Sequence, residues 1–131
     1  MATTTAQVKL TSADLASDSL SIDVTSTLTD AGLTTGITDS TGIAVKKLVS
    51  NSTTYTIHDA ADSTDNKAAK AFIYNKSTTA ADYITVDLGT VAMGRLYAGD
   101  WAFFPYAGLV DITVQGSANN MMVEYAVLGD L

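Results

Sequence analysis

The residues most capable of chemistry lie in an acidic segment that follows the only histidine of the chain. His58 precedes Asp59, Asp62 and Asp65, whose carboxylates could donate oxygen ligands to calcium. Their spacing by three differs from the EF-hand pattern, in which ligands alternate around a central glycine and a glutamate ends the loop. A Ser-His-Asp triad needs a serine aligned with the imidazole, and the chain contains no Gly-x-Ser-x-Gly turn. We therefore predict a solvated acidic loop with a surface histidine and no metal ligands.

A second candidate, Gly94–Gly99, has the two-glycine spacing of a phosphate-binding loop. Asp100 and Trp101 stand where such a loop requires a lysine followed by serine or threonine, and a carboxylate there would repel phosphate. We interpret the two glycines as part of a β-hairpin and its turn.

Carboxylate pairs that could serve glycoside hydrolysis also exist, for example Asp82 with Asp87 or Asp111 with Glu124. Asp87, Asp111 and Glu124 each occupy a polar position in a segment where apolar and polar residues alternate, so a place on the solvent face of a strand explains them. We predict no catalytic residue, no cofactor and no enzymatic activity.

The overall composition narrows the remaining classes of function. A chain of 131 residues suffices for one domain with its own core. The net charge of −7 opposes binding to nucleic acid, and the absence of cysteine excludes disulfides and thiolate zinc sites. The longest apolar stretch, residues 101–110, is far shorter than the roughly 20 residues of a membrane helix. We expect neither nucleic acid nor membrane as a partner.

Alternation of apolar and polar residues predicts strands along almost the whole chain. It is clearest in five segments: 20–24, 55–57, 84–88, 110–114 and 123–127. Further candidates are 7–10, 43–49, 71–74, 93–97 and 101–104. Helical signals, in 12–16 and 62–70, are too short to form a layer. We predict an all-β fold, an antiparallel β-sandwich or jelly-roll-like arrangement, with about eight to ten short strands and little or no helix.

Turn residues separate these strands. Gly99 and Asp100 fit a two-residue hairpin loop between the strands 93–97 and 101–104. Pro105 has no backbone N–H and should lie at a strand end or on an edge strand. Strand order stays open, because alternation identifies the faces of a strand and not its neighbours.

The two halves of the chain differ in composition. Residues 1–66 contain 24 Ser and Thr and one aromatic residue, whereas residues 67–131 contain 7 Ser and Thr and nine aromatic residues. Aromatic side chains bury the most area, so we expect 67–131 to supply most of the core, with 11–66 completing a single sandwich domain over 11–131. Residues 1–10 have little to pack against and are predicted to form a flexible N-terminal arm.

Core filling is the default role of the aromatic segment around Trp101, and we expect an interface between subunits where one of its rings leaves the core. Phe103 and Phe104 are adjacent in a predicted strand, so their side chains point to opposite faces and one of them can leave the core. An exposed aromatic residue at this place would be typical of a protein–protein contact. The predicted interface residues are Val8 and Leu10 of the arm and Trp101, Phe104, Pro105 and Tyr106 of the strand.

The segments 71–77, 83–88, 96–105, 110–114 and 122–127 together resemble small β-sandwich virion proteins of tailed bacteriophages. In that family a strand ending in Asn-x-Ser precedes an Ile-x-Val strand, a Leu-x-x-Gly-Asp turn leads into an aromatic strand, and a Val-Glu-Tyr strand follows. The resemblance covers about residues 70–130. It implies a non-enzymatic structural protein of the virion, above all a capsid decoration (cement) protein that stabilises the head.

The resemblance also implies partners and a location. Decoration proteins form homo-oligomers, often trimers, and bind the major capsid protein or other virion proteins, so the expected location is the capsid surface after synthesis in the host cytoplasm. The alternative is a protein associated with the tail, collar or fibre, or a carbohydrate-binding sandwich. The glycan-binding alternative predicts that Trp101, Tyr106 or Tyr83 is exposed in a shallow cleft.

Overall fold

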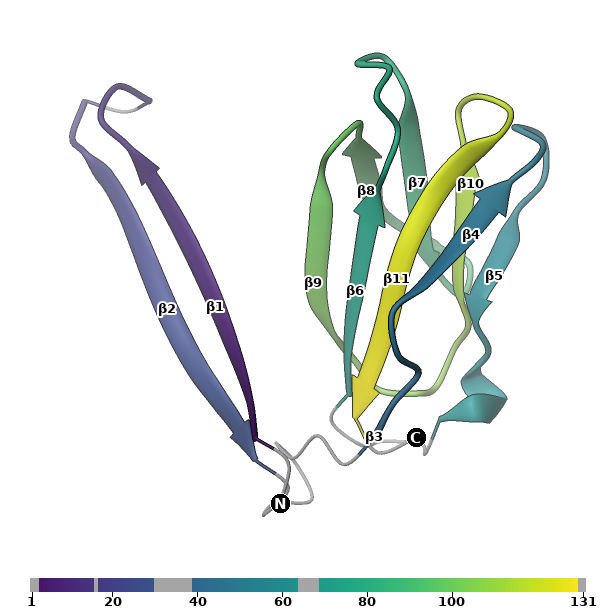
Figure 1. The fold of residues 1–131 in the computed structure, drawn as a ribbon, viewed down its shortest axis with the longest axis horizontal. Helices are drawn as coiled ribbons and strands as arrows, with labels where there is room; N and C mark the ends of the chain where they lie inside the picture. Colours follow the sequence, from purple (N-terminus) through teal and green to yellow (C-terminus); the bar gives the residue numbers. More distant parts are fainter. Residues whose placement is uncertain (1–2, 16, 30–38, 64–68, 130–131) are drawn as a thin grey trace.

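The computed structural model describes residues 3–15, 17–29, 39–63 and 69–129, which form a β-hairpin and a β-sandwich (Figure 1). The hairpin consists of β1 (Thr3–Ser12) and β2 (Leu20–Thr29). The sandwich consists of β3 (Asp39–Ser40), β4 (Ala44–Leu48), β5 (Tyr55–His58), β6 (Ala69–Asn75), β7 (Tyr83–Leu88), β8 (Val91–Tyr97), β9 (Trp101–Tyr106), β10 (Ile112–Gly116) and β11 (Met121–Gly129). Each segment predicted to be a strand overlaps one of these, and the prediction of an all-β antiparallel sandwich is confirmed.

Two antiparallel sheets make up the sandwich. One has the strand order β5-β10-β7-β8, and the other has the order β3-β11-β6-β9 with β4 also paired to β11. β11 is the central strand of its sheet, because β6 pairs with one of its sides while β4 and β3 pair in succession with the other. It therefore joins segments that are far apart in the sequence.

The core lies between the two sheets, where each strand turns alternate residues inward. In β6, for example, Ala69, Ala71 and Ile73 are buried, and the residues between them face outward. Among the described residues before position 67, Leu48 and Ile57 belong to the core. The described part of 67–131 contributes the others: Ala69, Ala71, Ile73, Ile84, Val86, Phe104, Tyr106, Ile112, Val114, Met121, Val123 and Val127.

Residues 3–12 form strand β1, so most of the predicted arm is an ordered partner of β2. The pairing runs without a break from Thr3 opposite Thr29 to Ser12 opposite Leu20. These strands pack extensively against each other and at most marginally against the described strands of the sandwich, beside which they stand in Figure 1. The predicted boundary at residue 10 is therefore corrected. Residues 3–29 form the hairpin, and the sandwich begins at β3, because two segments with matching alternation pair with each other.

The turn at residues 98–100 does not close a hairpin, contrary to prediction. β8 pairs with β7 in one sheet and β9 pairs with β6 in the other, so the turn carries the chain across the sandwich. The Asp100 amide donates to the Tyr97 carbonyl at 2.8 Å, and Gly99 has a φ of 82°. Such a turn can serve a corner as well as a hairpin. Pro105 lies on β9, the edge strand of its sheet, as predicted.

Helical structure in the described residues is a single 3-10 turn, Ala60–Asp62. Of the predicted helical turn at 12–16, residues 13–15 lie in the loop that follows β1, where the Ser12 hydroxyl accepts from the Leu15 amide at 3.1 Å, and residue 16 lies outside the described part of the chain. The other predicted turn, 62–70, overlaps the start of β6, and residues 64–68 lie outside the described part of the chain.

Candidate interaction surface

The outer faces of the two sheets differ in chemistry. β7 and β10 turn Thr85, Asp87 and Thr113 outward, whereas Tyr83 of β7 and Tyr97 of the edge strand β8 form an aromatic pair, so this sheet presents a mixed surface. The other sheet turns four aromatic side chains outward, which we call the aromatic face: Phe72 and Tyr74 from β6, and Trp101 and Phe103 from β9. In the register of these strands Phe72 lies opposite Phe103, and Tyr74 lies opposite Trp101. Two cross-strand aromatic pairs therefore cover the outside of the β6–β9 sheet.

The local sequence explains why these aromatic residues are outside. Small and aliphatic residues of β6 fill the inner positions, which leaves Phe72 and Tyr74 on the outer ones. Trp101 begins β9 and is 53 % exposed. Contiguous apolar surface of this kind on a folded domain is typical of an interaction site.

The adjacent phenylalanines divide between the two faces, as the alternation required. Phe104 lies opposite Ala71, whose small side chain leaves room for it inside, and it is only 8 % exposed. Phe103 is the one that leaves the core. Tyr106 also belongs to the core at 4 % exposure, and its hydroxyl donates to the Val110 carbonyl at 2.7 Å. The placement of Phe104 and Tyr106 on an exposed surface is therefore corrected.

The other predicted interface residues are exposed. Val8 and Leu10 lie on β1, and Trp101 and Pro105 lie on β9. Five further apolar residues at the surface were not predicted from the sequence: Phe72, Tyr74 and Phe103, which are half-buried, and Ile22 and Val24, which are exposed. A signal for Phe72 and Tyr74 was present, because aromatic residues alternate with Ala71 and Ile73 and only one set could face inward.

The hairpin has one apolar and one polar face. Val8 lies opposite Val24 and Leu10 lies opposite Ile22 in its register. On the other face, the Gln7 side-chain amide donates to the Asp23 carboxylate at 2.9 Å. The hairpin apolar face, as we call it, is exposed or half-buried and carries no charge: Ala6, Val8 and Leu10 from β1, and Leu20, Ile22 and Val24 from β2.

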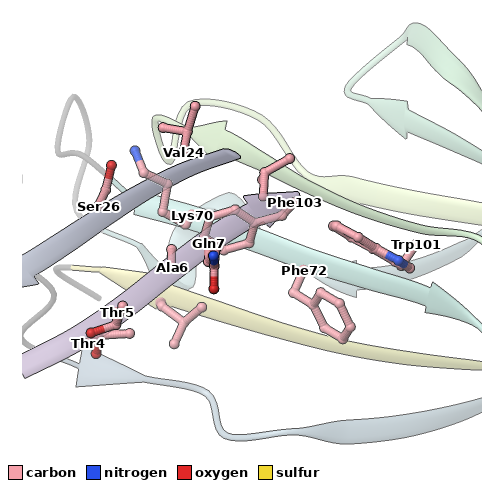
Figure 2. Close-up of a pocket in the computed structure, with 12 residues that line it drawn as sticks. Thr4, Thr5, Ala6, Gln7, Val24, Ser26, Lys70, Phe72, Trp101 and Phe103 are labelled. Atoms are coloured by element: carbon pink, nitrogen blue, oxygen red, sulfur yellow. The ribbon is translucent and has the colours of Figure 1, made fainter. Parts of the chain in front are cut away.

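A groove of about 520 Å³ separates the hairpin from the aromatic face (Figure 2). Phe72, Trp101 and Phe103 line it on the sandwich side, with Lys70 and Leu128 beside them. The hairpin side consists of residues 4–8 with Val24 and Ser26. Residues nearer the hairpin loop, including Leu10 and Ile22, do not line this groove. The part of the hairpin apolar face that contains Leu10 and Ile22 therefore lies outside the groove.

A second, open hollow of about 530 Å³ lies on the same sheet. It is lined by Phe72, Tyr74, Gly99, Trp101 and Glu124. The Glu124 carboxylate forms an ion pair with Lys76 at 3.0 Å. An aromatic ring and a carboxylate thus lie at the same hollow.

His58 is buried, which corrects the prediction of a surface histidine. Its ring lies edge-on to Tyr106 with 5.6 Å between centroids, and its Nε2 forms a hydrogen bond of 2.6 Å with the Ser63 hydroxyl. This bond, which the sequence did not reveal, holds the end of the 3-10 turn against β5. Burial lowers the pKa of His58, and three nearby carboxylates oppose that shift: Asp62, Asp59 and Asp111.

Four of the carboxylates considered for chemistry accept local hydrogen bonds. Asp59 accepts from the Ala61 amide and Asp111 from the Ala60 amide, each at 2.9 Å, so both stabilise the 3-10 turn. Asp100 accepts from the Tyr97 amide at 2.9 Å in the turn after β8, and Asp82 accepts from the Ser77 hydroxyl at 2.8 Å. Asp65 lies outside the described residues. In the ranges that are described, no three acidic, histidine or cysteine side chains gather as metal ligands.

No protein-family model, curated protein or solved structure matches this chain. A search of the described residues for a helix of membrane-spanning length and hydropathy also finds none.

Proposed function

We propose that this protein is a non-enzymatic structural subunit of a tailed-bacteriophage virion, and specifically a capsid decoration protein that stabilises the head. The observation that carries the proposal is the β1–β2 hairpin, which presents an uncharged apolar face outside the sandwich. The resemblance of residues 70–130 to small virion proteins supports the location. A homo-oligomer, with a trimer favoured by the resemblance, and the major capsid protein or another virion protein are the proposed partners.

The physical basis is the marginal stability of an isolated hairpin. A two-stranded hairpin in water needs a third strand or a packing surface to become stable. The sandwich, meanwhile, leaves Trp101 of its aromatic face exposed and the other three rings of that face half-buried. Both uncovered surfaces gain stability when a partner protein covers them, because a partner that binds only the folded state stabilises it.

The proposal is tested on particles. Phage particles from a culture that carries this coding sequence would be banded by density and probed with an antibody against the purified protein. We expect the protein in the particle band, with gold label on heads in negative-stain micrographs. Label on tails or collars would favour the tail-associated alternative, and absence of the protein from the particles would refute a role in the virion.

Glycan binding is the second candidate function, and the exposed Trp101 favours it. Of the three aromatic residues that this hypothesis places in a shallow cleft, Trp101 lines an open hollow with Tyr74 and Glu124. Tyr106 is buried, and Tyr83 lies 4.2 Å beneath the Arg95 guanidinium. An aromatic platform beside a carboxylate suits a sugar ring, which stacks on one and donates hydroxyl hydrogen bonds to the other.

A glycan array and quenching of Trp101 fluorescence test this function. Binding that Trp101→Ala abolishes and Tyr97→Ala retains would support it, since Tyr97 is an exposed aromatic residue outside the hollow. An array without hits would remove it.

A further inference from the structure

We propose that the groove between the β1–β2 hairpin and the aromatic face binds a small amphiphile, an anion with an extended apolar tail such as a fatty-acid anion. Lys70 holds the anionic head, and the rings of the aromatic face cover the tail. The inference goes beyond the structural role proposed above and does not depend on it, because it concerns a ligand of the single chain.

The size and the lining of the groove are those of a small-molecule site. Its volume is about 520 Å³, within the range of about 300–1,000 Å³ that such sites occupy. Rings of the aromatic face form one wall and residues of the hairpin form the other, so a ligand between them loses water on two sides (Figure 2). Apolar surface predominates in the lining and a few polar groups interrupt it, which favours a ligand that is mostly apolar.

Lys70 is the charged residue of the lining and determines which polar head the groove prefers. None of the described residues that line the groove is acidic, although the chain has a net charge of −7. Within the described part of the chain no carboxylate pairs with Lys70, whereas Lys76 is paired with Glu124. Ser26 adds a hydroxyl to the lining from the hairpin side. An ammonium group without a carboxylate partner, in a lining without acidic residues, is complementary to an anion.

The strand register gives the direction in which the ligand lies. Lys70, Phe72 and Tyr74 alternate with buried residues along β6 and form one outward-facing row. On β9, Phe103 lies opposite Phe72 and Trp101 lies opposite Tyr74. Four residues at about 3.3 Å each make this row about 13 Å long. A ligand with its head at Lys70 therefore crosses the Phe72–Phe103 pair, and its tail reaches Trp101.

The hairpin wall supplies aliphatic contacts for the same tail. Val8 and Val24 lie opposite each other in the hairpin and both line the groove. Val24 is 57 % exposed, so the single chain leaves it largely in water. A tail between the two walls removes these side chains and the rings from water together. Affinity should therefore increase with each methylene that the groove buries.

Fluorescence of Trp101, the sole tryptophan, measures binding to the purified full chain. We expect dodecanoate, below its micelle concentration, to shift the emission to shorter wavelength. Decanoate should bind about tenfold more weakly, because it has two methylenes fewer to bury. Acetate has the head without the tail and should cause no shift.

Lys70→Met tests the head of the ligand. The variant keeps an unbranched apolar side chain but loses the charge, so it should weaken decanoate binding by about fivefold or more. Decanol has the same tail without the charge, and its binding should be unchanged in the variant, which also shows that the groove is intact. Lys47→Met is the matched control, because Lys47 is an exposed lysine of β4 outside the groove.

Val24→Asp tests whether the hairpin is a wall of the site. A carboxylate at this position lies in the groove and repels an anionic ligand, so decanoate binding should be lost. Thr25→Asp is the control, because it adds the same charge to the neighbouring residue of β2, which does not line the groove. The control should bind decanoate as the wild type does.

Any of four results would overturn the proposal. Three are the absence of a shift with dodecanoate, an unchanged decanoate affinity in Lys70→Met, and an unchanged affinity in Val24→Asp, which would place the ligand outside the groove. The fourth is sedimentation with phosphatidylglycerol vesicles without binding of monomeric dodecanoate, which would indicate a membrane surface instead. None of these results decides the particle experiment, so the failure of the ligand site and the failure of the virion role are distinguishable.

Discussion

Replacing Asn75 with alanine should destabilise the sandwich more than any surface substitution, because its side chain joins the two sheets. Asn75 ends β6 and is 0 % exposed. Its Nδ2 donates to the Leu96 carbonyl at 2.9 Å, and its Oδ1 accepts from the Ser77 amide at 2.9 Å. Leu96 belongs to β8 in the other sheet, so the first of these bonds crosses the sandwich.

The size of the effect follows from the two groups that lose their partner. An orphaned buried donor or acceptor costs about 1–3 kcal/mol, so the Leu96 carbonyl and the Ser77 amide together cost about 4 kcal/mol. At about 4 °C per kcal/mol for a domain of this length, the melting temperature falls by about 15 °C. Urea unfolding followed by circular dichroism measures the free energy directly through the midpoint.

Asn75→Asp separates the donor from the acceptor. Aspartate keeps the oxygen that receives the Ser77 amide but, when ionised, places a second oxygen against the Leu96 carbonyl. The folded state therefore raises the pKa of this carboxyl above its ordinary value of about 3.9 and binds a proton more readily than the unfolded chain. The deficit relative to the wild type should be largest at pH 7 and shrink as the pH falls toward 4, where the protonated carboxyl can donate.

Asn119→Ala is the matched control. Asn119 is exposed, and its Oδ1 accepts from the Asn51 amide at 2.8 Å. Because water can replace this bond, its loss should cost less than about 1 kcal/mol. An Asn75→Ala variant no less stable than Asn119→Ala, or an Asn75→Asp deficit that is the same at both pH values, would refute the role assigned to the cross-sheet bond.

Three further predictions concern single side chains. Burial lowers the pKa of His58, so below about pH 6.5 the unfolded chain binds a proton more readily than the folded state does. The melting temperature should therefore fall from pH 7.5 to pH 5.5. His58→Gln should flatten this pH dependence, and a variant with the same dependence as the wild type would show that His58 does not cause it. Val123→Ala, at a fully buried position of β11, should cost about 2–4 kcal/mol in urea unfolding, and a loss below 1 kcal/mol would argue against a close-packed core there. Gly99→Ala should lower the free energy of unfolding by about 1–2 kcal/mol, because φ is 82° and alanine is disfavoured in this backbone conformation. No atom lies near the added Cβ, so a steric clash would not contribute. An unchanged midpoint of urea unfolding would contradict the positive φ.

The strands could be predicted from the sequence because each carries its own alternation. Ile84-Thr-Val86, for instance, places both aliphatic residues inside without reference to any other segment. The pairing of one strand with another could not be predicted from this alternation. The Tyr97–Asp100 turn has the chemistry of a hairpin, yet β8 and β9 pair with β7 and β6 in different sheets, since nothing in a turn of this size states which sheet receives the next strand.

The sequence predicted that an aromatic ring would leave the core, but it did not predict which residues would form the interaction surface. Adjacent Phe103 and Phe104 required that one ring leave the core, but the choice depended on Ala71, which lies opposite Phe104 and makes room for it. Likewise, the alternation in residues 7–10 and 20–24 identified two strands. Their pairing with each other outside the sandwich, which exposes the apolar residues of both, is a property of the topology.

The position of β11 has a consequence for the order of folding during synthesis. β11 pairs with β3, β4 and β6, which precede it in the sequence, so their sheet lacks its centre until residues 121–129 have left the ribosome. The β1–β2 hairpin contains only local contacts and can form in microseconds, long before that moment. A nascent chain thus exposes its hairpin apolar face before its own sandwich has folded. On a polysome, finished neighbours would be the first surfaces that this ribbon meets.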